Sequence, residues 1–326
     1  MKMKEKILRM LRRQEEYVSG QQMCQELGVS RTAVWKVINQ LKAEGYVIEA
    51  ISNKGYVLRE SPDTVTEYEL QSLIPNDSLI SNIISYKELD STNNKAKEIA
   101  CDYDENMLLI AERQLAGRGS KGRSWYAPEG EGIWMSFLLH PSIAPIHASR
   151  LTLIAALSVV KAIEEESGLN PKIKWPNDVL LHDKKVCGIL TEMSSEMDYI
   201  HYVIIGIGIN VHTKEFPEDL KQTTTSIALE GKIIKRSRLI CKLVEHFNRY
   251  YKSFLETEDL SAFTSEYNKL LIHKDKSIQV VSINSKKEGI ARGIDATGSL
   301  LLELPDGRVQ PIISGEVSIR GLHGYI

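Results

Sequence analysis

The hydrophobic pattern of this chain changes twice, and each change sets a different kind of local structure. From residue 3 to 41, apolar residues recur three or four positions apart, which is the period of an α-helix. Residues 67–273 mix helical and strand patterns, and from Lys274 onward apolar and polar residues alternate, as in a β-strand. A chain of 326 residues is expected to form two or three domains. We therefore predict domains at 1–60, 67–273 and 274–326, with the polar segment Arg59–Thr66 as a linker.

The first segment predicts a winged helix-turn-helix. A helix is expected over residues 3–13, and Ser19 with Gln22 forms the pattern of a capping box that opens a second helix. Ser30 is expected to cap a third helix after a tight glycine turn, and two short helices joined in this way form a helix-turn-helix. Two strand-like runs follow and predict a hairpin wing: Tyr46–Ala50 and Tyr56–Leu58.

The charge of this segment indicates a nucleic-acid partner. Residues 1–60 contain 11 Lys and Arg against 7 Glu, while the whole chain has a formal net charge of −2. A basic segment on an acidic body is typical of a DNA-binding module. A small helical protein-interaction domain with a solvated basic face is the alternative. The outward side chains of the third helix are expected to reach bases or phosphates: Arg31, Thr32, Trp35, Lys36 and Asn39.

The last segment predicts a small β-barrel, because several short strands alternate with turns in about fifty residues. The turns are expected at Thr297-Gly298 and at Pro305-Asp306-Gly307. The expected strands are Ile278–Ser282, Glu288–Ile294, Leu300–Leu304 and Arg308–Ile312.

The middle segment predicts a mixed α/β domain. Its expected strands are Met107–Arg113, Ile133–Leu139, Ile173–Trp175, Val179–Leu181, Val186–Met193 and Tyr202–Val211, and its expected helices are Asn94–Ala100, Leu151–Ser167 and Arg238–Phe254. Ser91 or Thr92 can cap the first of these helices. Gly206 and Gly208 lie inside the last strand, where glycine marks a close approach of the backbone to another group, or a bulge. We expect them to pass a ligand ring.

Between two of these strands lies the glycine-rich loop, Gly117–Trp125, which reads Gly-Arg-Gly-Ser-Lys-Gly-Arg-Ser-Trp. Backbone N–H groups in glycine-rich turns form concavities that bind anions, and arginine can grip a phosphate or carboxylate through two hydrogen bonds. The spacing is neither that of a P-loop nor that of a dinucleotide-binding fingerprint. The loop therefore predicts anion binding without naming the anion, and a solvated surface turn is the alternative.

Polar side chains gather at the predicted strand ends: Ser91, Thr92, Asn93, Gln114, Arg118, Lys121, Arg123, Asn177, Asp178, Lys185 and Asn210. Cations and amides dominate this set, which contains neither a Ser-His-Asp arrangement nor a pair of catalytic carboxylates. Such a site suits phosphoryl or nucleotidyl transfer, in which the substrates supply the reacting atoms. Asp178 beside Asn177 could hold Mg²⁺ through oxygen ligands. Alternatively, Asp178 caps a turn after Pro176 and Lys185 is solvated.

Four motifs carry a resemblance to bacterial biotin protein ligases of the two-function type that also represses the biotin operon. They are Gly-Arg-Gly-x-x-Gly-Arg-x-Trp (117–125), Lys-Trp-Pro-Asn-Asp (174–178), Lys-x-Cys-Gly-Ile-Leu-x-Glu (185–192) and Gly-Ile-Gly-Ile-Asn (206–210). The resemblance covers all three segments in order. It implies a multidomain α+β protein with an N-terminal winged helix-turn-helix and a central α/β domain similar to class II aminoacyl-tRNA synthetases and lipoate ligases. The C-terminal segment is then a small SH3-like β-barrel.

The resemblance also implies a two-step reaction. The carboxylate of biotin attacks the α-phosphate of ATP, which gives biotinyl-5′-AMP and pyrophosphate. A lysine of the biotin carboxyl carrier protein of acetyl-CoA carboxylase then attacks the mixed anhydride. Biotinyl-5′-AMP is further implied to be the corepressor that drives homodimerisation on operator DNA.

By position, the resemblance assigns catalysis to Lys185, Arg118 and Asp178, with Asp178 also facing Mg²⁺. It assigns the nucleotide to Lys121, Arg123, Trp125, Asn177 and Asn210. It assigns biotin to Ser91, Thr92, Asn93, Gln114, Gly117, Arg118, Gly119, Ser120, Lys185, Gly188 and Gly206. Residues 117–120 are implied to close as a flap over the carboxylate and the phosphate.

One residue departs from the family pattern. Its best-known members carry arginine where this chain has Ser120, and serine cannot form the same ion pair. Either the adenylate is retained less tightly here or Lys121 takes over this contact. Two other functions stay open on the sequence: a lipoate-type ligase, and a ligand-sensing repressor without catalysis.

The remaining composition indicates a cytoplasmic protein. The four cysteines are scattered without zinc spacing and are expected to be reduced core thiols: Cys24, Cys101, Cys187 and Cys241. Arg9, Arg12 and Arg13 interrupt any signal-peptide core, and no membrane association is expected.

Overall fold

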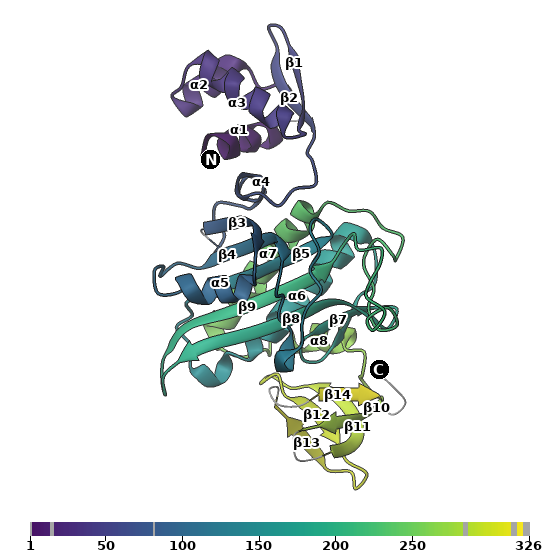
Figure 1. The fold of residues 1–326 in the computed structure, drawn as a ribbon. Helices are drawn as coiled ribbons and strands as arrows, with labels where there is room; N and C mark the ends of the chain where they lie inside the picture. The colour runs from purple at the N-terminus through teal and green to yellow at the C-terminus, as the bar shows by residue number, and fades with distance from the viewer. Residues whose placement is uncertain (1, 14–15, 81, 283–285, 314–317, 322–326) are drawn as a thin grey trace.

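The computed structural model describes residues 2–13, 16–80, 82–282, 286–313 and 318–321. Three parts follow one another along the molecule (Figure 1): a winged head, a central domain built on a large sheet, and a small sheet domain near the C-terminus. This order agrees with the predicted one. Parts of the predicted third domain, at 283–285, 314–317 and 322–326, lie outside the described residues.

The head contains the predicted helix-turn-helix and wing. Its elements are α1 (Lys2–Arg13), α2 (Gly20–Leu27), α3 (Arg31–Ala43), β1 (Val47–Ile51) and β2 (Gly55–Glu60). The hydroxyls of Ser19 and Ser30 both cap their helices by accepting backbone N–H groups. The Gln22 side chain donates to Glu26 at 2.9 Å and does not return to Ser19, so only half of the capping box forms.

The central domain is built on a seven-stranded sheet with strand order β3-β4-β5-β9-β8-β7-β6. Strands β3 and β4 pair in parallel, while each of the other described neighbours pairs antiparallel. The strands are β3 (Asn82–Leu89), β4 (Met107–Gln114), β5 (Gly132–Leu139), β6 (Lys172–Lys174), β7 (Asp178–Leu181), β8 (Lys184–Ser195) and β9 (Ile200–Asn210).

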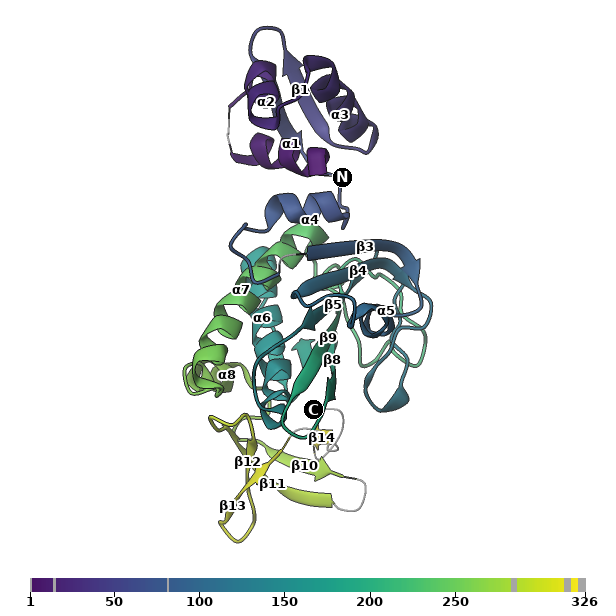
Figure 2. The same cartoon turned by 90° about the vertical axis from the view of Figure 1, so that its left-hand side faces the viewer.

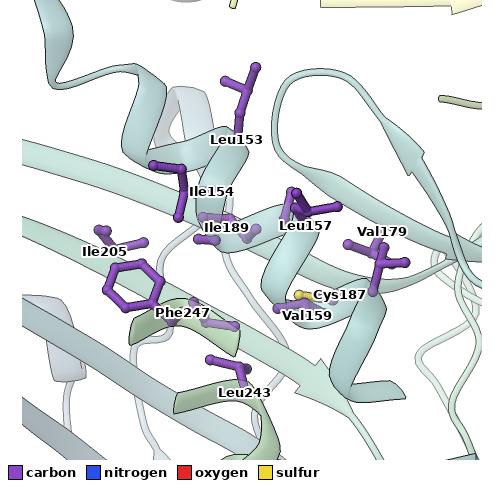
Figure 3. Close-up of a cluster of buried hydrophobic side chains, with 14 of the residues drawn as sticks. Leu153, Ile154, Leu157, Val159, Val179, Cys187, Ile189, Ile205, Leu243 and Phe247 are labelled. Atoms are coloured by element: carbon purple, nitrogen blue, oxygen red, sulfur yellow. The ribbon is translucent and has the colours of Figure 1, made fainter. Parts of the chain in front are cut away.

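Helices cover the two faces of this sheet unequally. The long helices α6 (Arg150–Ser167) and α7 (Arg236–Thr257) lie side by side on one face, and the short α5 (Thr92–Ile99) lies on the other (Figure 2). Figure 3 shows the core between α6, α7 and the sheet, where Phe247 of α7 lies beside Ile205 of β9, and Ile189 of β8 lies near Ile154 and Leu157 of α6. Because α5 is short, part of its face of the sheet is left for the site described below.

Helix α6 with the residues before it, Pro145–Ser167, is long and apolar enough to cross a membrane by composition. In the folded chain 67% of its most apolar 18-residue window is buried inside the protein. Its apolar character therefore has a simple cause, which is that it packs against both the sheet and α7.

Several elements were not expected from the sequence. They are α4 (Glu67–Leu73), β3, α8 (Thr264–Leu270) and the short 3₁₀ turns η1 (Ser120–Gly122) and η2 (Pro145–His147). The sequence did not predict helix α4, because the acidic Glu69 stands on the face of the helix that the fold buries. Strand β3 lies at the sheet edge, where only Ile83 is buried and the other residues are partly or fully exposed, so buried and exposed side chains do not alternate along it.

The C-terminal part is a five-stranded antiparallel sheet with order β13-β12-β11-β10-β14. Its strands are β10 (Ser277–Val281), β11 (Lys286–Ile294), β12 (Leu300–Glu303), β13 (Val309–Ile312) and β14 (Ser318–Gly321). The strand predictions thus hold within a few residues, except that β14 was not expected.

Two polar clusters join the head and its linker to the central domain. Arg12 of α1 forms an ion pair with the buried Glu69 at 2.7 Å, and the Tyr46 hydroxyl donates to the same carboxylate at 2.7 Å. In the linker, Asp63 contacts Arg236 at 3.0 Å and His212 at 2.9 Å. Burial alone would raise the pKa of Asp63, but His212 and Arg236 outweigh it and lower that pKa. The linker is therefore held by charge at both ends.

The cysteine prediction is wrong for one residue. Cys187 is buried, and burial raises the pKa of its thiol, so it is an unreactive core residue. Cys24 and Cys241 are half-buried, but Cys101, just beyond α5, is exposed. All four are free thiols.

Acidification is expected to destabilise the fold through His273, which is buried where the central domain meets the small sheet domain. Burial, with Lys174 and Lys276 nearby, lowers the pKa of His273 to about 4. As the pH falls, His273 is protonated near pH 6.5 in the unfolded chain but only near pH 4 in the folded chain. The unfolded state therefore binds more protons between these values, and the free energy of unfolding decreases as the pH falls through this range. From this group alone, we expect unfolding free energy at pH 5 to be about 2 kcal/mol lower than at pH 7.

Urea unfolding at the two pH values measures this difference. His273→Leu should remove most of it, because leucine does not titrate, whereas His201→Gln, at an exposed position of β9, should keep it. An unchanged pH dependence in His273→Leu would contradict the assignment.

Candidate functional site

A cavity of about 180 Å³ lies on the α5 face of the central sheet. Its floor is formed by β5, β8 and β9, and the start of α5 and the glycine-rich loop close two sides. The segment 211–228, which follows β9, closes a third. The lining residues are Ser91, Thr92, Asn93, Gln114, Arg118, Gly119, Ser120, Arg123, Ser124, Trp125, Tyr126, Met135, Asn177, Lys185, Gly188, Ile189, Leu190, Gly206, Ile207, Gly208, Asn210, Phe216, Leu220, Thr223 and Thr224.

The structure brings together most of the biotin, nucleotide and catalytic residues predicted from the sequence, although they come from six separate stretches of the chain. Of those predicted residues, all of which the structure describes, three do not line the cavity: Gly117, Lys121 and Asp178. Lys121 is exposed in the η1 turn with φ 59°, outside the cavity lining, so its replacement of the family's arginine stays a prediction. Asp178 lies behind Lys185, and Gly117 packs against the backbone of Trp125.

Gly188 and Gly208 make room for the Trp125 ring. The two glycines face each other across β8 and β9, and a Cβ on either would lie 2.7 or 2.6 Å from the indole. A Cβ on Gly206 would collide with Asn93. The strand register is regular at these positions, so the bulge alternative is wrong, and the ring that passes Gly208 belongs to the chain itself. Trp125 Nε1 is buried without a hydrogen-bond partner among the described residues.

A hydrogen-bonded network fixes the polar end of the cavity. Gln114 Oε1 accepts from the Thr92 backbone N–H at 2.7 Å and from its hydroxyl at 3.1 Å. The Ser136 hydroxyl lies 2.7 Å from both Thr92 Oγ1 and Asn93 Oδ1. Neither Ser91 nor Thr92 makes a side-chain cap of α5, so capping does not explain these hydroxyls. Ser136 was missed because it is a single polar residue in an apolar strand, which is the one signal the sequence offered.

The cavity lining also carries cations, which are Arg118, Arg123 and Lys185. Lys185 Nζ lies 2.6 Å from Asp178 Oδ1 and 5.1 Å from the centre of a Trp125 ring. Arg123 donates to the Ser120 hydroxyl at 2.9 Å, so Ser120 orients a neighbouring cation instead of carrying one. The site therefore combines uncharged hydrogen-bonding groups with cations, which suits a ligand that carries both an uncharged polar group and an anionic group.

The 211–228 segment is the part of the site that the sequence analysis missed. Phe216 stacks edge-on against Tyr126 at 6.4 Å between ring centres, which joins this segment to the glycine-rich loop. Backbone hydrogen bonds at 2.8 and 2.9 Å connect Lys185 to Thr223 and Thr225. The segment has no regular period and little secondary structure, so no sequence pattern pointed to it.

The predicted DNA-binding face is exposed as expected. Arg31, Thr32, Trp35 and Lys36 of α3 are exposed, with Trp35 at 59%, and Asn39 is half-buried. The opposite face of α3 buries Val34, Ile38 and Leu41 against the rest of the head.

The described residues contain no cluster of three or more His, Cys, Asp or Glu side chains placed to hold a metal ion. Magnesium commonly keeps several waters and is held by one or two carboxylates together with substrate phosphates. A single carboxylate such as Asp178, close to a cationic cavity, fits that pattern and does not fit an all-protein cage.

Comparison with known proteins agrees with this architecture in each part. Residues 4–57 match the HTH domain model, residues 86–210 the biotin/lipoate A/B protein ligase family, and residues 270–320 the biotin protein ligase C-terminal domain. The chain is 38% identical over 308 residues to the bifunctional ligase/repressor BirA of Bacillus subtilis, covering 93% of this chain and 94% of that protein.

Two further relatives lack part of this chain's length. The biotin–[acetyl-CoA-carboxylase] ligase of Paracoccus denitrificans is 30% identical and matches 71% of this chain and 98% of its own. The structure of biotin protein ligase from Aquifex aeolicus in complex with biotin and ATP has a TM-score of 0.66 and 33% identity, covering 74% of this chain and 100% of its own.

Proposed function

Because this chain belongs to the family of bifunctional biotin ligases and repressors, we propose that its cavity binds biotin and ATP and joins them as biotinyl-5′-AMP. The protein is an ATP-dependent biotin–[acetyl-CoA-carboxylase] ligase that also represses transcription of the biotin operon, with biotinyl-5′-AMP as corepressor. The observation that carries the proposal is that the cavity combines uncharged hydrogen-bonding groups around Gln114 and Thr92 with the cations Lys185 and Arg118.

The uncharged hydrogen-bonding groups of the lining suit the ureido ring of biotin, which carries both hydrogen-bond donors and an acceptor. Gln114 Oε1 is held by Thr92, and Thr92 is held in turn by Ser136, so these groups are ordered before a ligand enters. Pre-ordered partners reduce the entropy that binding must overcome. We assign Ser91, Thr92, Asn93 and Gln114 to the binding of this ring, together with Gly188 and Gly206, two glycines that bring the strand backbone close to the ligand.

The cations of the lining suit the two groups that react, the carboxylate of biotin and the α-phosphate of ATP. Biotin's carboxylate and the α-phosphate of ATP are both negative, so they repel until cations lie beside them. We propose that Lys185 and Arg118 neutralise this pair while the carboxylate oxygen attacks phosphorus and pyrophosphate leaves. Asp178 holds the Lys185 ammonium in place at 2.6 Å. Arg123, Trp125, Asn177 and Asn210 then serve the nucleotide.

The same proposal covers the groups that arrive from solution. Mg²⁺ would come with ATP and neutralise its phosphates, with Asp178 as its protein ligand. The biotin carboxyl carrier protein would bring the lysine that attacks the anhydride and releases AMP. The fold resemblance to class II synthetases, the SH3-like closure of the last domain and a cytoplasmic location stay predictions.

The experiment is radiolabelled pyrophosphate exchange into ATP with biotin, with lipoate, or with neither. Exchange that depends on biotin alone is expected. Exchange with lipoate instead would favour the lipoate-type ligase, and no exchange with either would favour a repressor without catalysis.

Lys36→Ala is expected to weaken operator binding and to reduce the salt dependence of binding by about one unit of log–log slope, because one phosphate contact is lost. Fluorescence anisotropy with operator DNA over a range of salt concentrations measures both. Lys269→Ala, which removes an exposed lysine of α8 in the central domain, is the matched control and should change neither. If Lys36→Ala also changes neither, Lys36 is not at the interface.

A further inference from the structure

Glu192 closes the motif Lys-x-Cys-Gly-Ile-Leu-x-Glu, yet the reaction proposed above gives it no role. It lies in β8, two residues beyond Leu190 and four beyond Gly188, so the three share the cavity face of the sheet. The intervening Thr191 faces the other way and contacts Thr152 of α6 at 2.7 Å. The Glu192 side chain is 19% exposed and is not among the residues that line the cavity.

Three side chains surround the Glu192 carboxylate. Lys97 of α5 donates to Oε1 at 2.6 Å, and Asn93 Nδ2 donates to Oε2 at 2.8 Å. Arg118 of the glycine-rich loop is farther away, with Nη1 at 3.3 Å from Oε1. Burial raises the pKa of Glu192, but its contacts with Lys97, Asn93 and Arg118 outweigh burial and lower it. The group is therefore a carboxylate at neutral pH.

Of these partners, Arg118 is held the least tightly. Its Nη1 lies 3.3 Å from the Glu192 carboxylate, whereas Lys97 Nζ lies 2.6 Å from it, although the two side chains are similarly exposed at 40% and 38%. Arg118 also donates to Asn94 Oδ1 at 2.9 Å. Arg118 also lines the cavity, whereas Lys97 does not. When Arg118 leaves, Lys97 still neutralises the carboxylate, so no unpaired charge remains beside the site.

We propose that Glu192 is a positioning residue that holds Arg118 beside the cavity in the free protein. When an anionic ligand binds, Arg118 leaves Glu192 for the ligand, and Glu192 stays paired with Lys97. Ion pairs that are partly exposed are weak, so an entering carboxylate or phosphate can replace Glu192 as the partner of the Arg118 guanidinium. The same carboxylate keeps Asn93 oriented, with its Oδ1 toward Ser136. The proposal rests on the anionic ligand proposed above for this cavity.

Two substitutions are expected to act in opposite directions. Glu192→Gln keeps an acceptor for Asn93 but loses the attraction for Arg118, which frees the glycine-rich loop. Lys97→Gln leaves Arg118 as the main cation on Glu192, which tightens the hold on that loop. A residue that only stabilises the fold would not produce effects of opposite sign.

Limited trypsin digestion of the free protein tests the hold directly, because the loop contains Arg118, Lys121 and Arg123. We expect cleavage in this loop to be about three- to fivefold faster in Glu192→Gln and slower by a similar factor in Lys97→Gln. Glu98→Gln, which breaks the Lys95–Glu98 pair elsewhere on α5, is the matched control and should match the wild type.

Steady-state kinetics test the release. Lys97→Gln should raise the KM for biotin about threefold with little change in kcat, and the double substitution Glu192→Gln/Lys97→Gln should restore it. Equal cleavage rates in all variants, or changes in the same direction, would overturn the proposal. Because digestion is done without ligand, this result is separate from the proposed function, which fails instead if the wild type shows no biotin-dependent pyrophosphate exchange.

Discussion

Replacing Lys185 with alanine is expected to slow formation of biotinyl-5′-AMP about 10²–10³-fold, because one cation that stabilises the developing charge is removed. Lys185 is the lysine that lines the cavity, and it is fixed from two sides. Its ammonium is held by Asp178 at 2.6 Å, and its backbone is joined to Thr223 and Thr225 of the 211–228 segment. Pyrophosphate exchange at saturating biotin and ATP measures the loss in kcat.

The adjacent Lys184 provides the matched control, because it is exposed at the start of the same strand. Lys184→Ala should retain wild-type exchange. Lys185→Ala also removes the ammonium 2.6 Å from the Asp178 carboxylate, which is 14% exposed, and the loss of this ion pair by itself lowers stability. The double substitution Lys185→Ala/Asp178→Asn removes that charge. Near-wild-type exchange in either Lys185 variant, with folding confirmed by thermal unfolding, would refute the catalytic assignment.

Biotinyl-5′-AMP is expected to strengthen dimerisation about 5–150-fold, the range of common allosteric couplings. The glycine-rich loop carries Arg118, Lys121 and Arg123 within six residues, and an anionic ligand can draw these cations together. An ordered loop that contributes to a dimer surface would convert adenylate binding into association. A dimer presents two winged heads, which suits a two-fold operator. The same surface would serve the carrier protein, so modification and repression should compete.

Sedimentation equilibrium with and without biotinyl-5′-AMP measures the two dimerisation constants. Equal constants would mean that repression works by another route. Gly119→Ser gives a second check, because a Cβ there would lie 3.3 Å from the Arg123 carbonyl and stiffen the loop. That variant should lose adenylate retention and dimerisation together. Coupling must also be reciprocal, so dimerisation on operator DNA should tighten adenylate binding by the same factor.

The sequence by itself determined the order of the parts and most of their elements. The helical period, the serine caps and the basic balance predicted the winged head, because these signals are local: a cap and its helix lie within a few residues of each other. The alternating pattern predicted the last sheet in the same way. Four short motifs pointed to the ligase chemistry and to the residues that line most of the cavity.

Only the tertiary structure decided how those residues meet. The pairing of β8 with β9 places Gly188 opposite Gly208, and these two receive Trp125 from a loop more than sixty residues earlier in the chain. Ser136 belongs to the site because its side chain in β5 points toward α5. The 211–228 segment lines the cavity because the chain after β9 passes over this face of the sheet. Strand register and side-chain direction fix these contacts, and residue spacing along one chain does not report which distant strands pair or which faces meet.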